Sequence, residues 1–109
     1  MSEIIVADEI IKLETTRDHL INLLRRLRNN ELSEKVVLEI INDNSEVKRY
    51  FLIEVMEIIR DELRFSRLTD FLDGYGNFGV KYNLSELLEK VIRGIELRLE
   101  NLRRRLEWR

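Results

Sequence analysis

Residues that break helices are confined almost entirely to one place in this chain. Its 109 residues include no proline and only four glycines, three of which lie between residues 74 and 79. Proline removes a backbone donor and glycine raises the entropic cost of ordering a helix, so segments that lack both are free to form long helices. We therefore predict an all-α chain whose clearest non-helical stretch is GYGNFGVKYN, residues 74–83.

A long helix is predicted over residues 3–30, because positions there repeat at alternating spacings of four and three residues. This is the heptad pattern of helices that pack along one side. Arg17 is the charged exception, and we expect it either to reach the surface or to pair with an acid across an interface. Asn29 and Asn30 are expected to end the helix. The repeating positions are Val6, Ile10, Leu13, Arg17, Leu20, Leu24 and Leu27.

A second long helix is predicted from residue 83 onward. Asn83 and Glu86 stand three residues apart, as the two members of a capping box do at the start of a helix. The segment that follows carries a second heptad pattern, nearly as long as the first. Its apolar positions are Leu88, Ile92, Ile95, Leu99, Leu102 and Leu106.

Two shorter helices are predicted between these long ones. One covers residues 32–42 and the other begins near residue 46, after the turn sequence NDNS, in which Asn44 or Ser45 is expected to cap the helix. The stretch YFLIEVMEII, residues 50–59, is apolar on two faces. That pattern is typical of a helix at the centre of a bundle.

Together these patterns predict a single helical domain over residues 1–109, built as a four- or five-helix bundle. The heptad-patterned terminal helices would pack on each other or, in coiled-coil fashion, on those of a second copy. The apolar fraction of 44% is sufficient for a core. A chain of this size buries only about two-thirds of its unfolded surface, so we expect a homodimer that buries more.

Composition excludes several classes of protein. Without cysteine the chain forms no disulfide and offers no thiolate to a metal or substrate. No apolar run approaches the roughly 18 residues of a membrane span, and the N-terminus lacks the basic start of a signal peptide, so we expect a cytoplasmic protein. Glutamine is absent and arginine outnumbers lysine 14 to 5, a composition that resembles those of thermophiles.

The last helix raises the main functional question, because apolar and basic residues share a stripe outside its heptad pattern. Trp and Arg are the residues that protein interfaces favour as anchors. We therefore expect a non-enzymatic interaction or assembly subunit that binds a protein partner or itself and needs no cofactor. The expected docking residues are Arg93, Leu97, Arg104 and Trp108, with Tyr75 and Phe78 of the glycine-rich stretch second.

Two other interpretations of the same stripe stay open. In one, the charges are structural, because Glu89 to Arg93 and Glu100 to Arg104 have the spacing of helix-stabilising ion pairs. In the other, the helix binds nucleic acid, since residues 93–109 carry six arginines against three glutamates. Residues 31–73 carry eleven acids against six bases, which would repel a phosphate backbone. The nucleic-acid residues would be Arg98, Arg103, Arg104, Arg105 and Arg109.

A third hypothesis is a magnesium-dependent, all-α nucleotide hydrolase. Glu54, Glu57 and Asp61 share one side of a predicted helix, and carboxylates are the ligands that Mg²⁺ prefers. Acids on a solvated helix face are common, so the sequence does not favour a metal site. The single histidine, His19, is expected at the surface without a nearby base or nucleophile, which gives acid–base catalysis little support.

Overall fold

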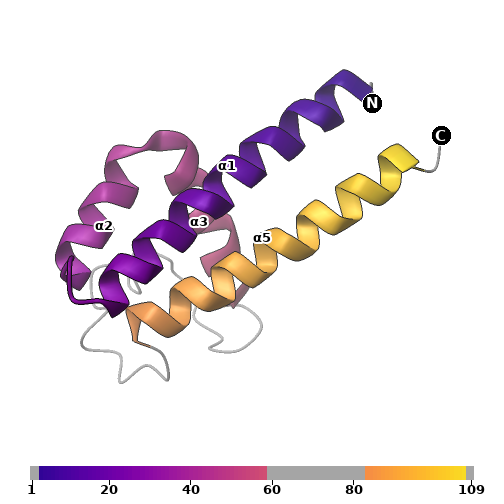
Figure 1. Cartoon of the computed structure of the whole chain (residues 1–109). Coiled ribbons are helices and arrows are strands. Elements are labelled where there is room, and N and C mark those ends of the chain that lie inside the picture. The colour runs from indigo at the N-terminus through magenta and orange to yellow at the C-terminus, as the bar shows by residue number, and fades with distance from the viewer. Residues whose placement is uncertain (1–2, 59–82, 108–109) are drawn as a thin grey trace.

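The computed structural model describes residues 3–58 and 83–107, and these residues form four helices and no strand (Figure 1). The helices are α1 (Glu3–Arg28), α2 (Glu34–Asp43), α3 (Ser45–Ile58) and α5 (Leu84–Glu107). The prediction of an all-α chain is confirmed for this part of the molecule. Residues 59–82, which include nearly all of the glycine-rich stretch, lie outside it.

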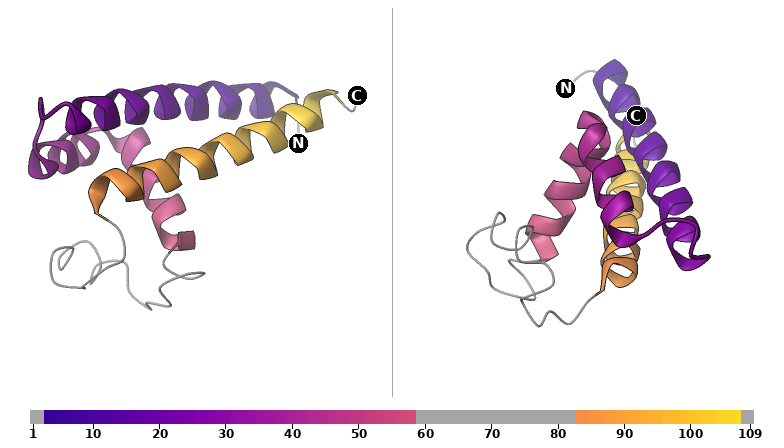
Figure 2. Two further views of the ribbon diagram at one scale, coloured as in Figure 1. Left: turned by 60° about the horizontal axis from the view of Figure 1, so that its bottom comes forward. Right: turned by 90° about the vertical axis from the view of Figure 1, so that its left-hand side faces the viewer.

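The two long helices, α1 and α5, lie side by side and run in opposite directions, so that both termini lie at one end (Figures 1 and 2). Two ion pairs connect them, Arg28 to Glu89 and Arg103 to Glu14, the latter at 2.7 Å. The paired residues are fourteen positions apart on each helix, which is two heptads. The antiparallel register therefore follows the heptad pattern of both helices.

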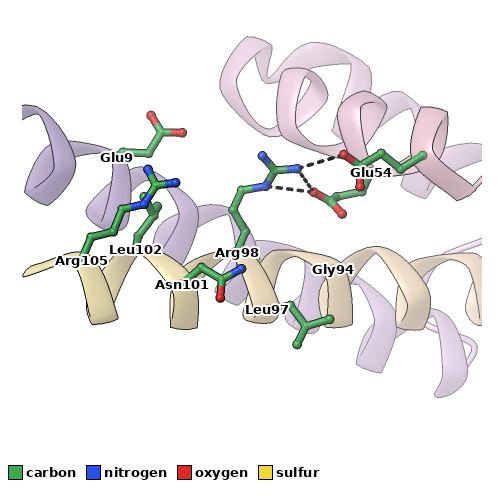
Figure 3. Close-up of a pocket in the computed structure, with 9 residues that line it drawn as sticks. Glu9, Glu54, Gly94, Leu97, Arg98, Asn101, Leu102 and Arg105 are labelled. Carbon is green, nitrogen blue, oxygen red and sulfur yellow. Dashed lines mark hydrogen bonds and ion pairs between the residues drawn. The ribbon is translucent and has the colours of Figure 1, made fainter. Parts of the chain in front are cut away.

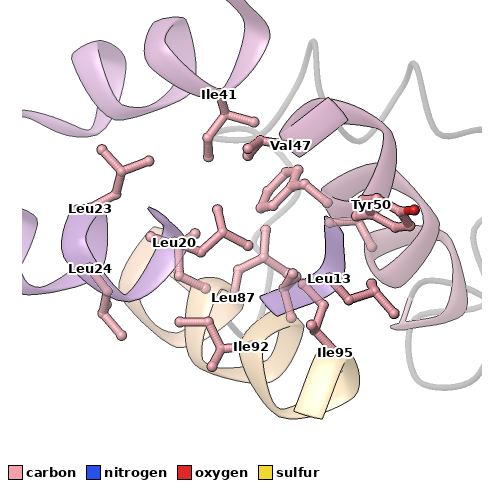
Figure 4. Close-up of a cluster of buried hydrophobic side chains, with 14 of the residues drawn as sticks. Leu13, Leu20, Leu23, Leu24, Ile41, Val47, Tyr50, Leu87, Ile92 and Ile95 are labelled. Atoms are coloured by element: carbon pink, nitrogen blue, oxygen red, sulfur yellow. The ribbon is translucent and has the colours of Figure 1, made fainter. Parts of the chain in front are cut away.

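Both heptad patterns face the hydrophobic core, as predicted (Figure 4). The two helices meet each other within one chain, which was one of the two arrangements expected. Leu27, Leu102 and Leu106 are only partly buried, because they lie toward the ends of their helices. The fully covered positions are Val6, Ile10, Leu13, Leu20 and Leu24 of α1 with Leu88, Ile92, Ile95 and Leu99 of α5.

Arg17, the charged member of the first pattern, forms no ion pair with a described residue of another helix of this chain. Its Nη2 lies 3.1 Å from Oδ1 of the adjacent Asp18, and its side chain is 23% exposed. The aliphatic stem can thus lie along the protein while the charge stays near water, which is the first of the two outcomes expected for it.

Helix α3 contacts α1, α2 and α5, so it holds the central place that its apolar composition predicts. On one of its two apolar faces Val47, Phe51 and Val55 are buried and Ile58 is partly buried. On the other face Leu52 is partly buried and Met56 is exposed. The buried residues of this region are Val37 and Ile41 of α2 with Val47, Tyr50, Phe51 and Val55 of α3.

The predicted helix ends are largely confirmed. Asn30 has a φ of 61°, and the amide of Glu31 donates to the carbonyl of Arg26 at 2.9 Å, which is the Schellman ending of a helix. Asn44 caps α3, since its Oδ1 accepts from the amide of Val47 at 3.1 Å.

Helix α5 is capped from two sides. Asn83 Oδ1 accepts from the amide of Glu86 at 2.9 Å, which is the asparagine half of the predicted capping box. Glu34 Oε2 of α2 accepts from the amide of Leu84 at 3.1 Å. Two of the amides that a helix leaves unpaired at its start are therefore satisfied, and the second contact ties α2 to α5.

Candidate functional site

The most unusual side chain of the described residues is Glu54 of α3, a carboxylate that is only 5% exposed. Arg98 of α5 donates to its Oε2 from Nε at 3.2 Å and from Nη2 at 2.8 Å (Figure 3). The same guanidinium lies 3.5 Å from Oε1 of Glu57. One arginine thus pairs with two carboxylates of α3, offsets one of their two charges and connects that helix to α5.

Gly94 makes room for this carboxylate. It lies one helical turn before Arg98, and a Cβ atom at that position would collide with Oε1 of Glu54. Glycine costs about 1 kcal/mol relative to alanine inside a helix. Its presence in the middle of α5 is explained by the close approach of Glu54 to the helix backbone.

Burial raises the pKa of Glu54 above its ordinary value of 4.5. The hydrogen bond and the charge of Arg98 lower this pKa, and the nearby Glu57 carboxylate raises it. The net effect is a raised pKa, because the free-energy cost of removing the carboxylate from water exceeds the stabilisation that one partly exposed guanidinium provides. Glu54 is therefore a carboxylate that forms an ion pair and still costs free energy to bury.

Two hollows lie along the side of α5 that faces α3. The larger, about 440 Å³, extends past Leu102 to Arg105 and is closed on one side by Glu9 of α1 (Figure 3). The smaller, about 270 Å³, extends in the other direction past Arg93 and Ile58. Both share Glu54, Glu57, Gly94 and Leu97, so we treat them as one groove, called the α3–α5 groove below.

Three of the predicted docking residues lie on described parts of α5. Arg93 and Leu97 are exposed and line the groove, and Leu97 is 58% exposed on its rim. Arg104 is exposed but outside the groove, and its Nη2 lies 2.5 Å from Oε1 of Glu100. Trp108, Tyr75 and Phe78 fall outside the described residues.

Most of the predicted nucleic-acid residues are paired with carboxylates. Arg98 is held by Glu54, while Arg103 and Arg104 have the partners given above. Arg105 is exposed and forms no ion pair with a described residue, and Arg109 lies outside the described part. The structural interpretation of the arginines therefore accounts for three of them. Its expected pair of Glu89 with Arg93 does not form, because Glu89 binds Arg28 instead.

The structure describes two of the three predicted metal ligands. Glu54 and Glu57 do lie together, but the guanidinium of Arg98 occupies the space between their oxygens. Within residues 3–58 and 83–107, no three His, Cys, Asp or Glu side chains are grouped as metal ligands would be. Asp61 lies outside these ranges.

His19 is half-buried, whereas the sequence led us to expect it at the surface. Its Nε2 is enclosed and has no hydrogen-bond partner among the described residues.

Sequence reasoning missed the roles of Gly94 and Arg98 in this groove. The signal for Gly94 was present, since an isolated glycine inside a helical pattern usually has a packing reason. Nothing in the sequence indicated that it receives Glu54, because the two residues are 40 positions apart and belong to different helices.

The described residues thus define an all-helical protein with a shallow, charged groove between two of its helices. None of the described helices is long and apolar enough to cross a membrane. A comparison of the chain with known protein families, with curated proteins and with solved structures found no match.

Proposed function

We propose that this chain is a non-enzymatic interaction subunit that docks a protein partner on the α3–α5 groove. The observation that carries the proposal is Leu97, a large aliphatic side chain left 58% exposed on the rim of a groove. Exposed apolar residues beside a concave surface are typical of partner sites, and charged residues at the rim add specificity.

The two alternatives have weaker support. Nucleic-acid binding needs cations that are free to contact phosphates, and Arg98, Arg103 and Arg104 are each paired with a carboxylate. A magnesium-dependent hydrolase needs carboxylates that are free to coordinate, and Glu54 and Glu57 already share Arg98. Nucleic-acid binding is an outcome that the experiment below distinguishes from protein docking.

The test is affinity capture from native extract at moderate salt, with and without nuclease, using the full chain and its Leu97→Ala variant. We expect the wild-type chain to retain a protein partner and the variant to lose it while its helical circular dichroism is unchanged. Ile21→Ala is the matched control, because Ile21 is an exposed aliphatic residue of α1 away from the groove. Equal capture by both variants would refute the proposal, and capture that nuclease abolishes would support nucleic-acid binding instead.

We also propose that the chain forms a homodimer through the outer side of α1. Ile4 and Ile11 are seven residues apart, so they lie on one side of the helix, and they are 81% and 61% exposed. Light scattering checks this proposal. The wild-type chain is expected at twice the mass of one copy and an Ile4→Ser/Ile11→Ser variant at the mass of one. A wild-type chain with the mass of a single copy at high concentration would disprove it.

A cytoplasmic location is part of the same proposal. Its support is the composition, since a chain of this size without cysteine is suited to a reducing compartment. Localisation of a tagged full-length protein in its native cells tests it.

A further inference from the structure

We propose that the occupant of the α3–α5 groove is an acidic amphipathic helix. This inference rests on the proposed function and names the chemistry of the partner. Its basis is the distribution of charge and apolar surface along α5 from Arg93 to Arg105.

The groove has the shape and length of a helix-binding site. The residues that line it on α5 extend from Lys90 to Arg105, which corresponds to about 22 Å along a helix axis. Its walls are themselves helices, and the described residues contain no strand whose edge an extended peptide would join. A partner helix that lies along α5 therefore fits the α3–α5 groove.

Three apolar residues border the groove and are available to such a helix. Ile58 borders the smaller hollow, Leu97 borders both hollows, and Leu102 borders the larger. Ile58 and Leu102 are partly buried and Leu97 is exposed. A partner helix with apolar residues on one face would cover all three, as in other helix-in-groove complexes.

The charges along the groove indicate whether an acidic or a basic partner would bind. In its middle, Arg98 pairs with both Glu54 and Glu57, which leaves one negative charge uncompensated there. Toward its two ends stand Arg93 and Arg105, both exposed, and neither forms an ion pair with a described residue. They are twelve residues apart, or about 18 Å along the helix. A helix with carboxylates near both ends would pair with both arginines.

Two features of the lining oppose an acidic partner: the charge of Glu57 that Arg98 leaves uncompensated, and Glu9. Glu9 borders the larger hollow near Arg105 (Figure 3) and forms no ion pair with a described residue. Replacing Glu9 with glutamine removes this charge without changing the size of the side chain. The proposal therefore requires that Glu9→Gln strengthen the binding of an acidic helix.

The experiment uses two designed helical peptides of about 18 residues, long enough to span the groove. They share one leucine face, and the polar face carries glutamate in one and lysine in the other. Fluorescence anisotropy with the full chain measures both affinities at low and at high salt. We expect the glutamate peptide to bind about tenfold more tightly, with a preference that salt weakens, because opposite charges attract across the rim.

Charge reversal makes the test specific. An Arg93→Glu/Arg105→Glu variant should prefer the lysine peptide, and neither change removes an ion pair seen in the described residues. Arg25→Glu/Lys35→Glu is the matched control, because it alters net charge equally at exposed positions of α1 and α2. The control should keep the wild-type preference for glutamate.

Three outcomes would overturn the proposal. They are binding of neither peptide, equal binding of both, and an unchanged preference in the Arg93→Glu/Arg105→Glu variant. If these occur while Leu97→Ala still abolishes capture of a natural partner, the acidic helix is wrong and the proposed function stands. If the peptides behave as expected but capture does not depend on Leu97, the failure lies with the proposed function.

Discussion

The carboxylate of Glu54 lies against the backbone of Gly94, at a point where any Cβ atom on residue 94 would collide with it. This contact joins two helices that are far apart in sequence, and it places a buried charge beside the arginine that neutralises it. It also decides how α3 meets α5, and thereby the position of the groove.

Gly94→Ala is expected to destabilise the fold, although the same change at an ordinary helix position stabilises by about 1 kcal/mol. The new Cβ would push Glu54 away from Arg98, and breaking a buried pair costs up to about 3 kcal/mol. We expect a net loss of about 1–2 kcal/mol, measured by chemical denaturation. In a Glu54→Ala background the same glycine change should instead stabilise, and a stabilised single variant would contradict the contact.

The pH dependence of stability should carry the signature of Glu54. Because its pKa is raised in the folded state, its contribution to the free energy of unfolding is complete below about pH 4.5 and is lost as pH rises through the folded pKa. Glu54→Gln removes this titration and leaves the other carboxylates. The stability of the wild-type chain relative to this variant should therefore fall as pH rises from about 4.5 through the raised pKa of folded Glu54. A relative stability that rises over this interval would show that Arg98 outweighs burial.

The register of α1 against α5 predicts a reciprocal charge effect. Glu14→Arg should destabilise by up to about 1 kcal/mol, since it places two positive charges together at an exposed pair. Adding Arg103→Glu should restore the stability, because the reversed pair has the same spacing. A double-mutant cycle by thermal unfolding measures the coupling. Additive effects of the two changes would indicate that these residues do not meet.

The ending of α1 predicts opposite effects of two small substitutions at Asn30. Its φ of 61° is accessible to glycine without strain, whereas an alanine side chain makes it unfavourable by about 1–2 kcal/mol. Asn30→Gly should preserve or raise the melting temperature, and Asn30→Ala should lower it. Equal melting temperatures for the two variants would argue against the Schellman ending.

The sequence was sufficient for features that depend on neighbouring residues. Most heptad positions of α1 and α5 are buried where predicted, and Asn30, Asn44 and Asn83 end or begin helices. Each of these follows from spacing and cap chemistry within a few residues. The same information placed Leu97 outside the core, where the structure has it.

Only the tertiary structure decided which surfaces meet. The sequence allowed the two long helices to pair within a chain or between copies, and it considered Arg98 only for an alternative nucleic-acid surface and Glu54 only as a disfavoured metal ligand. In the fold these two residues neutralise each other, and Gly94 is the reason that they can. Periodicity reports which side of a helix is apolar, but the partner of that side is selected by contacts between segments far apart in the chain, and no local pattern encodes those contacts.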